Sequence, residues 1–466
     1  MSITTPLALV CMLALATLAA AADREADRIH PWHQDARYWQ YRGEPVLLIG
    51  ASDQDNLFNH PHIPPDGLEA HLDRMRDAGG NYVRNTMSSR DIEDNLWPFH
   101  RDADTGLYDL DRFKDAYWQR FRDFLDMTAE RGIIVQIEIW DRFDFAREPW
   151  NHNPFNPRNN TNYSAEESGL PESITTHPGR RENPFFRSLP DLDDPNPELL
   201  AYQEALVRKM LDISLEYDHV LYCISNETND SEQWSTHWAE LLHAEAEARG
   251  KGIEVTEMWD PWNLDHPMHE RTFDRPDRYS FVDVSQNTHQ VGQAQWDNLQ
   301  RARQRVADPP RPVNNVKMYG GRHGGGAEEG QHKLWRNLLG GTASARYHRP
   351  GGGIGLNDVT AAHLASLRMV LEHINIFAAE PNLELLHDRE DDEAYLAALP
   401  GEQYALYFPK GGAVTLDLED APGNFHLRWL NVLASEWAAA AEVRGGERVD
   451  LTPPSDAPWA AVLVRE

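Results

Sequence analysis

The sequence predicts an α/β protein, a (β/α)8 TIM barrel followed by a small antiparallel β-sandwich domain. Short β-type runs alternate with helical patterns over the first 380 residues, as in a parallel sheet covered by helices. After residue 379 the pattern changes to short alternating runs separated by glycine turns, which is typical of antiparallel strands. The length of 466 residues also exceeds the usual size of one hydrophobic core. We therefore expect a barrel over residues 22–380 and a β domain over 381–466.

Eight β-type runs precede the β domain, at residues 45–52, 81–87, 133–141, 219–227, 253–259, 279–286, 312–319 and 344–348. Helical patterns lie between them, at residues 67–78, 111–131, 198–217, 233–249, 293–306, 329–339 and 359–378. Eight strand–helix units in this length are what a TIM barrel requires. We expect residues 261–277 to be irregular, and residues 38–45 to form a hairpin that turns at Gly43.

The N-terminal segment is typical of a signal peptide. Residues 6–22 form an uncharged apolar run that ends in alanines before Asp23, so we expect residues 1–21 to be removed and the protein to be exported to the periplasm or the exterior. No other stretch is long and apolar enough to predict a membrane span. Cleavage would leave Cys223 as the single cysteine, so we expect no intrachain disulfide.

Composition narrows the class of partner. The formal net charge of −31 argues against binding to nucleic acid or to an anionic membrane. The chain has 15 Trp and 15 Tyr, and aromatic rings pack against the C–H face of a sugar, although a large barrel core also uses such residues. The sequence contains no Walker loop, dinucleotide fingerprint or His-Glu-x-x-His motif, so we expect no cofactor.

One connection is unusually long. Residues 142–194 follow the third predicted strand and are rich in Asn and Pro. Long loops in compact domains are usually functional, and the loops after barrel strands lie on the face that carries the active site. We expect this segment to form a wall or lid of a cleft, with its amides suited to binding hydroxyl groups.

The most informative motif is Ile-Ser-Asn-Glu-Thr-Asn at residues 224–229, where the fourth predicted strand ends. A glycosidase needs a carboxylic acid beside the glycosidic oxygen, and a neighbouring amide can bind a sugar hydroxyl. We therefore expect Glu227 to be the general acid/base and Asn226 to contact substrate. An Asn-Glu pair can also be a simple loop cap, but its position is similar to that in the large clan of retaining glycosidases.

Other strand ends carry residues of the same kind. Arg84 ends the second strand, where it would support a carboxylate or be ion-paired inside the barrel. Trp140 and Asp141 end the third, as a sugar platform with a polar neighbour. His289 follows the sixth and would orient a carboxylate or serve as a structural polar group.

Several segments together resemble one family. Residues 333–344 read Lys-Leu-Trp-Arg-Asn-Leu-Leu-Gly-Gly-Thr-Ala-Ser, and residues 412–418, Arg428, Trp429, Pro453, Pro454 and Trp459 mark the C-terminal part. These segments resemble the apiosidase-like glycoside hydrolases that end in a β domain named for collagen binding. The resemblance covers most of the mature chain and implies a glycosidase with a carbohydrate substrate.

The sequence departs from this family at one important position. The family's seventh strand ends in a Glu that acts as nucleophile, whereas residues 312–320 here contain Lys317 and Tyr319 and no carboxylate. Lys317 cannot replace a nucleophile, but it can bind an anionic group or a carboxylate. The best substitute for the second carboxylate is Glu257, on the fifth strand, with Asp260 and Asp141 as weaker ones. The alternative role for Glu257 is a structural salt bridge with Lys317 or Arg84.

These observations predict a glycoside hydrolase that acts on a polysaccharide or oligosaccharide, with Glu227 and Glu257 as its catalytic pair. Arg84, Lys317, Tyr319 and His289 would shape the subsite. One alternative is a carbohydrate-binding pseudoenzyme, because the seventh-strand Glu is missing. Another is a metal-dependent hydrolase, suggested by His60 and His62, but the later parts of the fourth and fifth strands offer neither Lys nor His, so we expect no metal. Basic residues near the last two strand ends indicate a uronic or sulfated sugar: Lys317, Arg346, His348 and Arg349.

Overall fold

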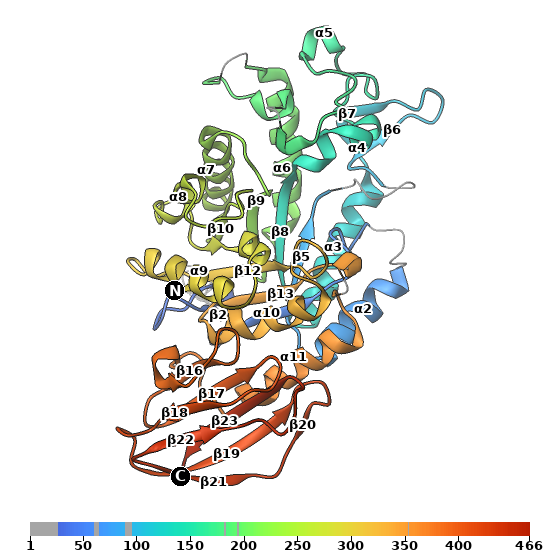
Figure 1. Cartoon of the computed structure of the whole chain (residues 1–466). Coiled ribbons are helices and arrows are strands. Elements are labelled where there is room, and N and C mark those ends of the chain that lie inside the picture. Colours follow the sequence, from blue (N-terminus) through green and yellow to red (C-terminus); the bar gives the residue numbers. More distant parts are fainter. Residues whose placement is uncertain (1–26, 60–64, 89–95, 181–182, 193–194, 353) are drawn as a thin grey trace, which may run out of the picture.

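The computed structural model describes residues 27–59, 65–88, 96–180, 183–192, 195–352 and 354–466. The expected signal peptide, His60 and His62 lie outside the described residues. Within the described part, an α/β region is followed by antiparallel sheets at the C-terminal end (Figure 1). No described helix has the length and apolar character needed to cross a membrane.

The α/β region contains eight parallel strands in two four-stranded sheets. One sheet has the order β10(Val255–Thr256), β9(Val220–Asn226), β8(Ile134–Asp141), β5(Tyr82–Thr86). The other has the order β11(Val282–Asp283), β12(Val313–Met318), β13(Ser344–Tyr347), β4(Leu48–Ala51). Every paired strand is parallel to its neighbour, and β13 pairs back to β4. This is the strand order of an eight-stranded barrel.

Backbone hydrogen bonds join the two sheets at both seams. The Asn81 amide donates to the Ile49 carbonyl at 2.8 Å between β4 and β5, and the Ser280 amide donates to the Val255 carbonyl at 3.1 Å between β10 and β11. All residues of the eight strands are buried. Buried apolar residues occur in every strand, which is why all eight could be located in the sequence, although β5, β12 and β13 also carry buried polar residues.

Helices follow the strands as expected: α2(Pro65–Asp77), α3(Asp115–Glu130), α6(Pro197–Ser214), α7(Glu232–Ala248), α9(Gly292–Arg305), α10(Ala327–Leu339) and α11(Asp358–Leu371). In α3 the apolar residues at spacings of three and four, Phe121, Phe124 and Leu125, are buried. Two predictions were wrong in detail. Residues 111–113 belong to β7(Tyr108–Phe113), which pairs with β6(Phe99–Arg101), because Tyr108 and Leu110 alternate with more exposed residues. The stretch expected to be irregular contains α8(Pro267–Phe273).

A small N-terminal sheet lies against the barrel. It contains β1(His30–Pro31), β2(Trp39–Tyr41) and β3(Glu44–Val46), and the β2–β3 hairpin turns at Arg42 and Gly43, both with positive φ. Trp39 is fully buried, and its indole N–H donates to Asn314 Oδ1 of β12 at 3.0 Å. The hairpin therefore packs against the barrel interior.

The C-terminal part contains two antiparallel sheets. The larger has the order β14(Glu380–Pro381), β16(Tyr395–Leu399), β17(Gln403–Phe408), β23(Trp459–Arg465), β19(Gly423–Asn431), β20(Glu436–Trp437), with β21(Ala441–Gly445) also paired to β19. The smaller has the order β15(Leu386–His387), β18(Val414–Asp417), β22(Arg448–Leu451), and η6(Leu383–Leu385) precedes β15. Residues from both sheets share one hydrophobic core.

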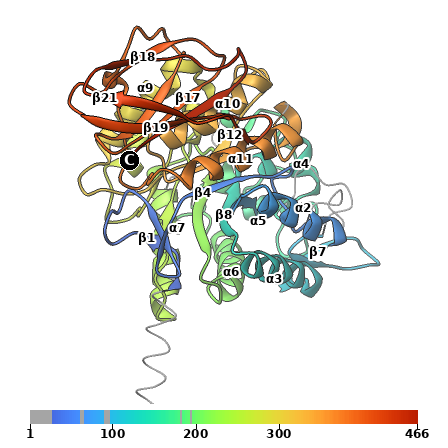
Figure 2. The same cartoon turned by 90° about the horizontal axis from the view of Figure 1, so that it is seen from below.

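The larger sheet packs on helices α10 and α11 of the α/β region (Figures 1 and 2). The Trp335 ring of α10 stacks on Tyr407 of β17 with centroids 4.7 Å apart. The Ser366 hydroxyl of α11 donates to the Val432 carbonyl at 2.7 Å. The C-terminal part is thus held against the outer helices rather than over the strand ends that carry the site.

Candidate active site

The site is built on the carboxyl ends of β9 and β12, which belong to different sheets. Asn226 is the last residue of β9, and Glu227 follows it. Lys317 lies in β12, and Tyr319 follows that strand. Glu227 has φ 54°, a left-handed conformation that is uncommon for a residue other than glycine. Strained backbone conformations of this kind are concentrated at functional sites, because they lower stability and are retained where function requires them.

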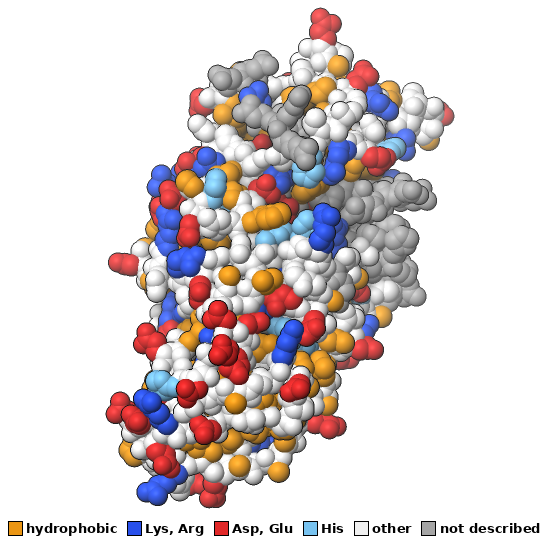
Figure 3. Space-filling view, in the orientation of Figure 1, with side chains coloured by type: hydrophobic (Ala, Val, Ile, Leu, Met, Phe, Trp, Pro, Cys, Tyr) orange, Lys and Arg blue, Asp and Glu red, His pale blue; other side chains and the backbone are white. Residues whose placement is uncertain are grey.

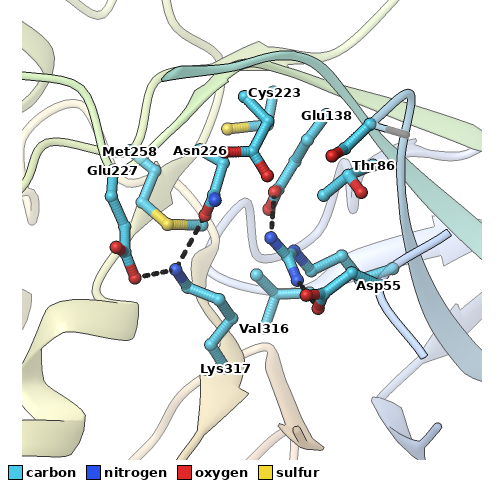
Figure 4. Close-up of polar contacts among 12 residues, drawn as sticks. Asp55, Thr86, Glu138, Cys223, Asn226, Glu227, Met258, Val316 and Lys317 are labelled. Carbon is cyan, nitrogen blue, oxygen red and sulfur yellow. Dashed lines mark hydrogen bonds and ion pairs between the residues drawn. The ribbon is translucent and has the colours of Figure 1, made fainter. Parts of the chain in front are cut away.

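An ion pair across the barrel joins the two strands (Figure 4). The Lys317 ammonium donates to Glu227 Oε1 and also to Asn226 Oδ1, the latter at 2.8 Å. The Tyr319 hydroxyl donates to the same Glu227 oxygen at 3.1 Å. The side chain of Lys317 is 1% exposed and that of Glu227 is 14% exposed, so water screens this pair little.

These contacts set the protonation states. Burial alone would raise the pKa of Glu227, but Lys317 holds it well below its ordinary value. Burial would lower the pKa of Lys317, but Glu227 raises it, and burial with Glu227 raises the pKa of Tyr319 to about 12. Glu227 is therefore ionised at neutral pH. A general acid must carry a proton, so in this state Glu227 has the form of a base or a nucleophile.

A second buried network lies beside the first. Arg84 of β5 donates from Nη1 to Asp55 at 2.7 Å and pairs through Nη2 with Glu138 of β8 at 2.5 Å (Figure 4). Arg349 pairs with the other Asp55 oxygen at 2.6 Å. Arg84 is thus ion-paired inside the barrel, which is one of the two roles that the sequence allows. The sequence analysis missed Asp55 and Glu138, although a Glu in the middle of the apolar run of β8 was a usable signal.

An open cleft lies above these networks, formed by two adjoining cavities of about 300 Å³ and about 600 Å³. Both are lined by Phe143, Glu227, Tyr319, His348 and Arg349. The smaller is also lined by Arg84, Arg147, Pro149, Asn226 and Lys317. The larger is also lined by Arg142, His177, Gly179, Asp260, Trp262, His289, residues 320–323 and Gly351. Among the described residues, no group of His, Cys, Asp or Glu is arranged to hold a metal ion.

Comparisons with known proteins show which solved structures share this fold. No family model matches the sequence, and no curated protein matches it. Solved structures do match: a glycoside hydrolase family 5 protein from Bacteroides vulgatus has a TM-score of 0.64 at 13% identity, with 95% of each chain covered. A protein described as a glycoside hydrolase also has a TM-score of 0.64, at 12% identity over 95% of this chain and 98% of that one. A second Bacteroides vulgatus structure, described as a glycoside hydrolase, has a TM-score of 0.59 at 14% identity over 95% and 83%.

The chain has the fold of these glycoside hydrolases. At 12–14% identity the similarity extends to the fold and not to individual site residues. The resemblance to the apiosidase-like family and to its collagen-binding domain stays a prediction.

An aromatic platform lies at the mouth of the cleft, and it is not the one predicted. Trp262 is 53% exposed and stacks on His289, with ring centroids 3.9 Å apart and planes at 14°. Burial lowers the pKa of His289 to about 4, so this pair is neutral. Trp140, the predicted platform, is 2% exposed and packs among core rings: Phe145, Phe185, Trp234 and Trp238. Its neighbour Asp141 is also buried, where it accepts a hydrogen bond from the Phe143 amide at 3.1 Å.

The structure does not bring Glu257 to the cleft. Its carboxyl group accepts hydrogen bonds from the Ser225 and Met258 amides at 2.8 and 2.9 Å and from the Ser235 hydroxyl of α7 at 2.6 Å. Because α7 covers the outside of the barrel, the carboxyl group faces the helix layer, and it pairs with neither Lys317 nor Arg84. Burial raises its pKa to about 8. This position removes Glu257 as the second catalytic carboxylate.

Asp260, a weaker substitute in the sequence, does line the cleft. Its amide donates to the Thr228 carbonyl at 2.9 Å, which fixes it beside the end of β9 and Glu227. Its carboxylate accepts a 2.6 Å hydrogen bond from Arg142 Nη2. Among the described residues, Glu227 and Asp260 are the two carboxylates that line the cleft.

The long connection forms one wall of the cleft. It contains η1(Arg142–Phe145), α4(Arg147–His152), α5(Ala165–Ser168), η2(Pro178–Arg180) and η3(Pro184–Arg187), whereas η4(Ser285–His289) and η5(Pro350–Gly352) follow later strands. Contrary to expectation, buried asparagine side chains of this segment do not bind ligand hydroxyl groups in the cleft. Asn153, Asn156 and Asn160 are buried and donate to backbone carbonyls of the same segment. The Asn-rich composition therefore stabilises the wall.

Proposed function

We propose that the protein is an exported glycoside hydrolase that acts on a polysaccharide or oligosaccharide, with Glu227 as a catalytic carboxylate. The observation that carries this proposal is the ionised Glu227 held at φ 54° in an open cleft at a barrel strand end. The exposed Trp262 beside it suits a sugar face. The fold supports the proposal, because the similar solved structures are described as glycoside hydrolases.

In this proposal Glu227 begins the reaction as a base or nucleophile. Lys317 and Tyr319 hold its carboxylate, and Asn226 accepts a hydrogen bond from Lys317. Asp260, on the neighbouring strand end, would be the second carboxylate. It is paired with Arg142, so it would carry the proton for the leaving oxygen only after bound substrate has drawn Arg142 away from it. Glycosidase carboxyl pairs lie about 5–10 Å apart, with the shorter distances in retaining and the longer in inverting enzymes.

The test is a reducing-sugar screen over diverse polysaccharides with the wild type and three variants. Glu227→Gln and Asp260→Asn should each lower turnover by about 100-fold or more, because each removes a group needed for proton transfer or attack. Glu257→Gln is the matched control and should retain activity, since its carboxyl group lies outside the cleft. Full activity in Glu227→Gln would disprove the central role, and full activity in Asp260→Asn would disprove the proton donor.

A second candidate function is carbohydrate binding without turnover. It is favoured by Lys317, which lies where the resembled family has its nucleophile and which already neutralises Glu227. A binding protein would retain glycans in the wild type and release no sugar from any of them. It would also bind equally well after Asp260→Asn, which changes no sugar-stacking ring.

A further inference from the structure

The cleft has a charge opposite to that of the chain. Overall, 75 acidic residues outnumber 44 basic ones. The two cavities are instead lined by two carboxylates and six basic side chains, Arg84, Arg142, Arg147, Lys317, Arg322 and Arg349. In Figure 3, Lys or Arg and His side chains gather across the middle of the face shown, whereas acidic side chains are numerous over the C-terminal sheets. A cationic cleft in an acidic protein concentrates the electric field where a ligand binds.

Some of these cations are already neutralised. Lys317 pairs with Glu227, and Arg84 and Arg349 share Asp55, with Glu138 completing the Arg84 pairing. Arg147 and Arg322 are exposed, and neither forms an ion pair within the part of the chain that the structure describes. The cleft therefore keeps an excess of positive charge after its internal pairs are formed.

Arg142 gives an independent indication of an anionic ligand. It is 4% exposed and donates from Nη2 to Asp260 at 2.6 Å, while its Nη1 and Nε find no acceptor among the described residues. A buried donor without an acceptor costs about 1–3 kcal/mol, so such groups usually have a partner. The planar fork of guanidinium donors matches the oxygens of a carboxylate or sulfate.

Arg142 and Arg147 are held at one aromatic ring. Their guanidinium carbons lie 5.2 and 6.0 Å from the centroid of Phe143, which lines both cavities. Arg147 adopts φ 58°, and its amide donates to the Ile174 carbonyl at 2.5 Å. A positive φ is unfavourable for arginine, so the backbone of the cleft wall is strained at the residue that carries this side chain.

We propose that the carbohydrate bound in this cleft is acidic, and that Arg142 and Arg147 bind its carboxylate or sulfate group beside Glu227. This inference rests on the proposed function for the position of the reacting sugar. The Lys317–Glu227 pair is compatible with it, because an approaching anion meets a neutralised carboxylate rather than a free negative charge.

The test measures binding of the full chain to matched polymers by affinity electrophoresis. Alginate is compared with its propylene glycol ester, and dextran sulfate with dextran, so each pair differs in acidic groups. The wild type should bind at least one acidic polymer about tenfold or more tightly than its neutral partner, and added salt should weaken that binding. Preference for alginate would identify a uronate ligand, and preference for dextran sulfate a sulfate ester.

Variants locate the binding site. Arg147→Gln and Arg142→Gln should each weaken binding to the acidic polymer about tenfold, because each removes a charge-assisted contact. Arg147 is exposed, so its variant tests the idea even if replacing the buried Arg142 disturbs folding. Arg444→Gln, an exposed position on β21 of the C-terminal sheets, is the matched control and should bind like the wild type.

Three outcomes would overturn the inference: neutral polymers bound as tightly as acidic ones, no acidic polymer bound, or unchanged binding in both cleft variants. Reducing-sugar release is measured in the same samples. Acidic polymers bound without cleavage of any glycan would reject the hydrolase proposal and leave this inference standing. Cleavage of a neutral glycan without binding of any acidic polymer would reject this inference and leave the hydrolase proposal standing.

Discussion

Replacing Lys317 with Met should destabilise the protein strongly, and more so at neutral pH than in acid. The change removes the ammonium that neutralises Glu227 and leaves a carboxylate that is 14% exposed. Removing one partner of a buried ion pair costs about 3–5 kcal/mol. Arg142 and Arg84 also lower the pKa of Glu227, but their charges are shared with Asp260, Asp55 and Glu138. In the variant, burial would therefore govern Glu227 and raise its pKa above the ordinary value of 4.5.

The sign of the pH effect follows from these two pKa directions. In the wild type the folded pKa of Glu227 is depressed, so its contribution to stability is present above pH 4.5 and is lost as pH falls through the folded pKa. In Lys317→Met the folded pKa is raised, so stability is greatest below pH 4.5 and is lost as pH rises through the folded value. The difference between the two proteins should therefore grow from pH 4 to pH 7.

Urea unfolding at the two pH values measures this difference, and a double variant supplies the control. Lys317→Met with Glu227→Gln leaves no uncompensated charge, so it should regain about 2 kcal/mol or more relative to the single variant at pH 7. Two results would refute the reasoning. One is that Lys317→Met loses the same stability at pH 4 and pH 7, and the other is that the loss in the double variant equals the sum of the losses in the two single variants.

Two further predictions concern Trp262, at the mouth of the cleft, and Glu257, which lies outside the cleft. Trp262→Ala should weaken substrate binding about 5- to 30-fold, seen as a higher KM, with little change in Tm because the ring is 53% exposed; an unchanged KM would exclude it as a sugar platform. Burial raises the pKa of Glu257 from 4.5 to about 8, so its contribution to stability is fully present below pH 4.5. This contribution is lost as pH rises through about 8, and the free energy of unfolding falls by at most about 1.4 kcal/mol per pH unit. Glu257→Gln should flatten the fall of Tm with pH over this range, and parallel Tm profiles would contradict the assignment.

The barrel strands could be located from the sequence because each contains buried apolar residues and lies between helical patterns. The strand-end rule then brought Arg84, Asn226, Glu227, Lys317 and Tyr319 together, since the carboxyl ends of parallel strands meet at one edge. Their mutual pairing could not be predicted, because it depends on how side chains cross the barrel from two separate sheets.

Glu257 shows where this reasoning stopped. Which face of a sheet a residue occupies depends on register, and a shift of one residue reverses it. The paired part of β10 is only Val255–Thr256, so the pattern leaves the direction of the next side chain open. Trp262 was missed for a related reason, because it lies in a loop, where no periodicity indicates orientation.

Lys317, on the strand that ends in a nucleophilic Glu in the resembled family, is part of a complete charge balance. If a seventh-strand carboxylate were simply deleted, Arg84 would be left as an uncompensated buried cation. Here Asp55 and Glu138 neutralise Arg84, while Lys317 neutralises Glu227. Buried charges are tolerated when they are paired, so both networks are complete without a carboxylate on β12. With these pairs formed, and with Arg142 paired to Asp260, the remaining positive charge of the cleft comes from Arg147 and Arg322 and can select the ligand.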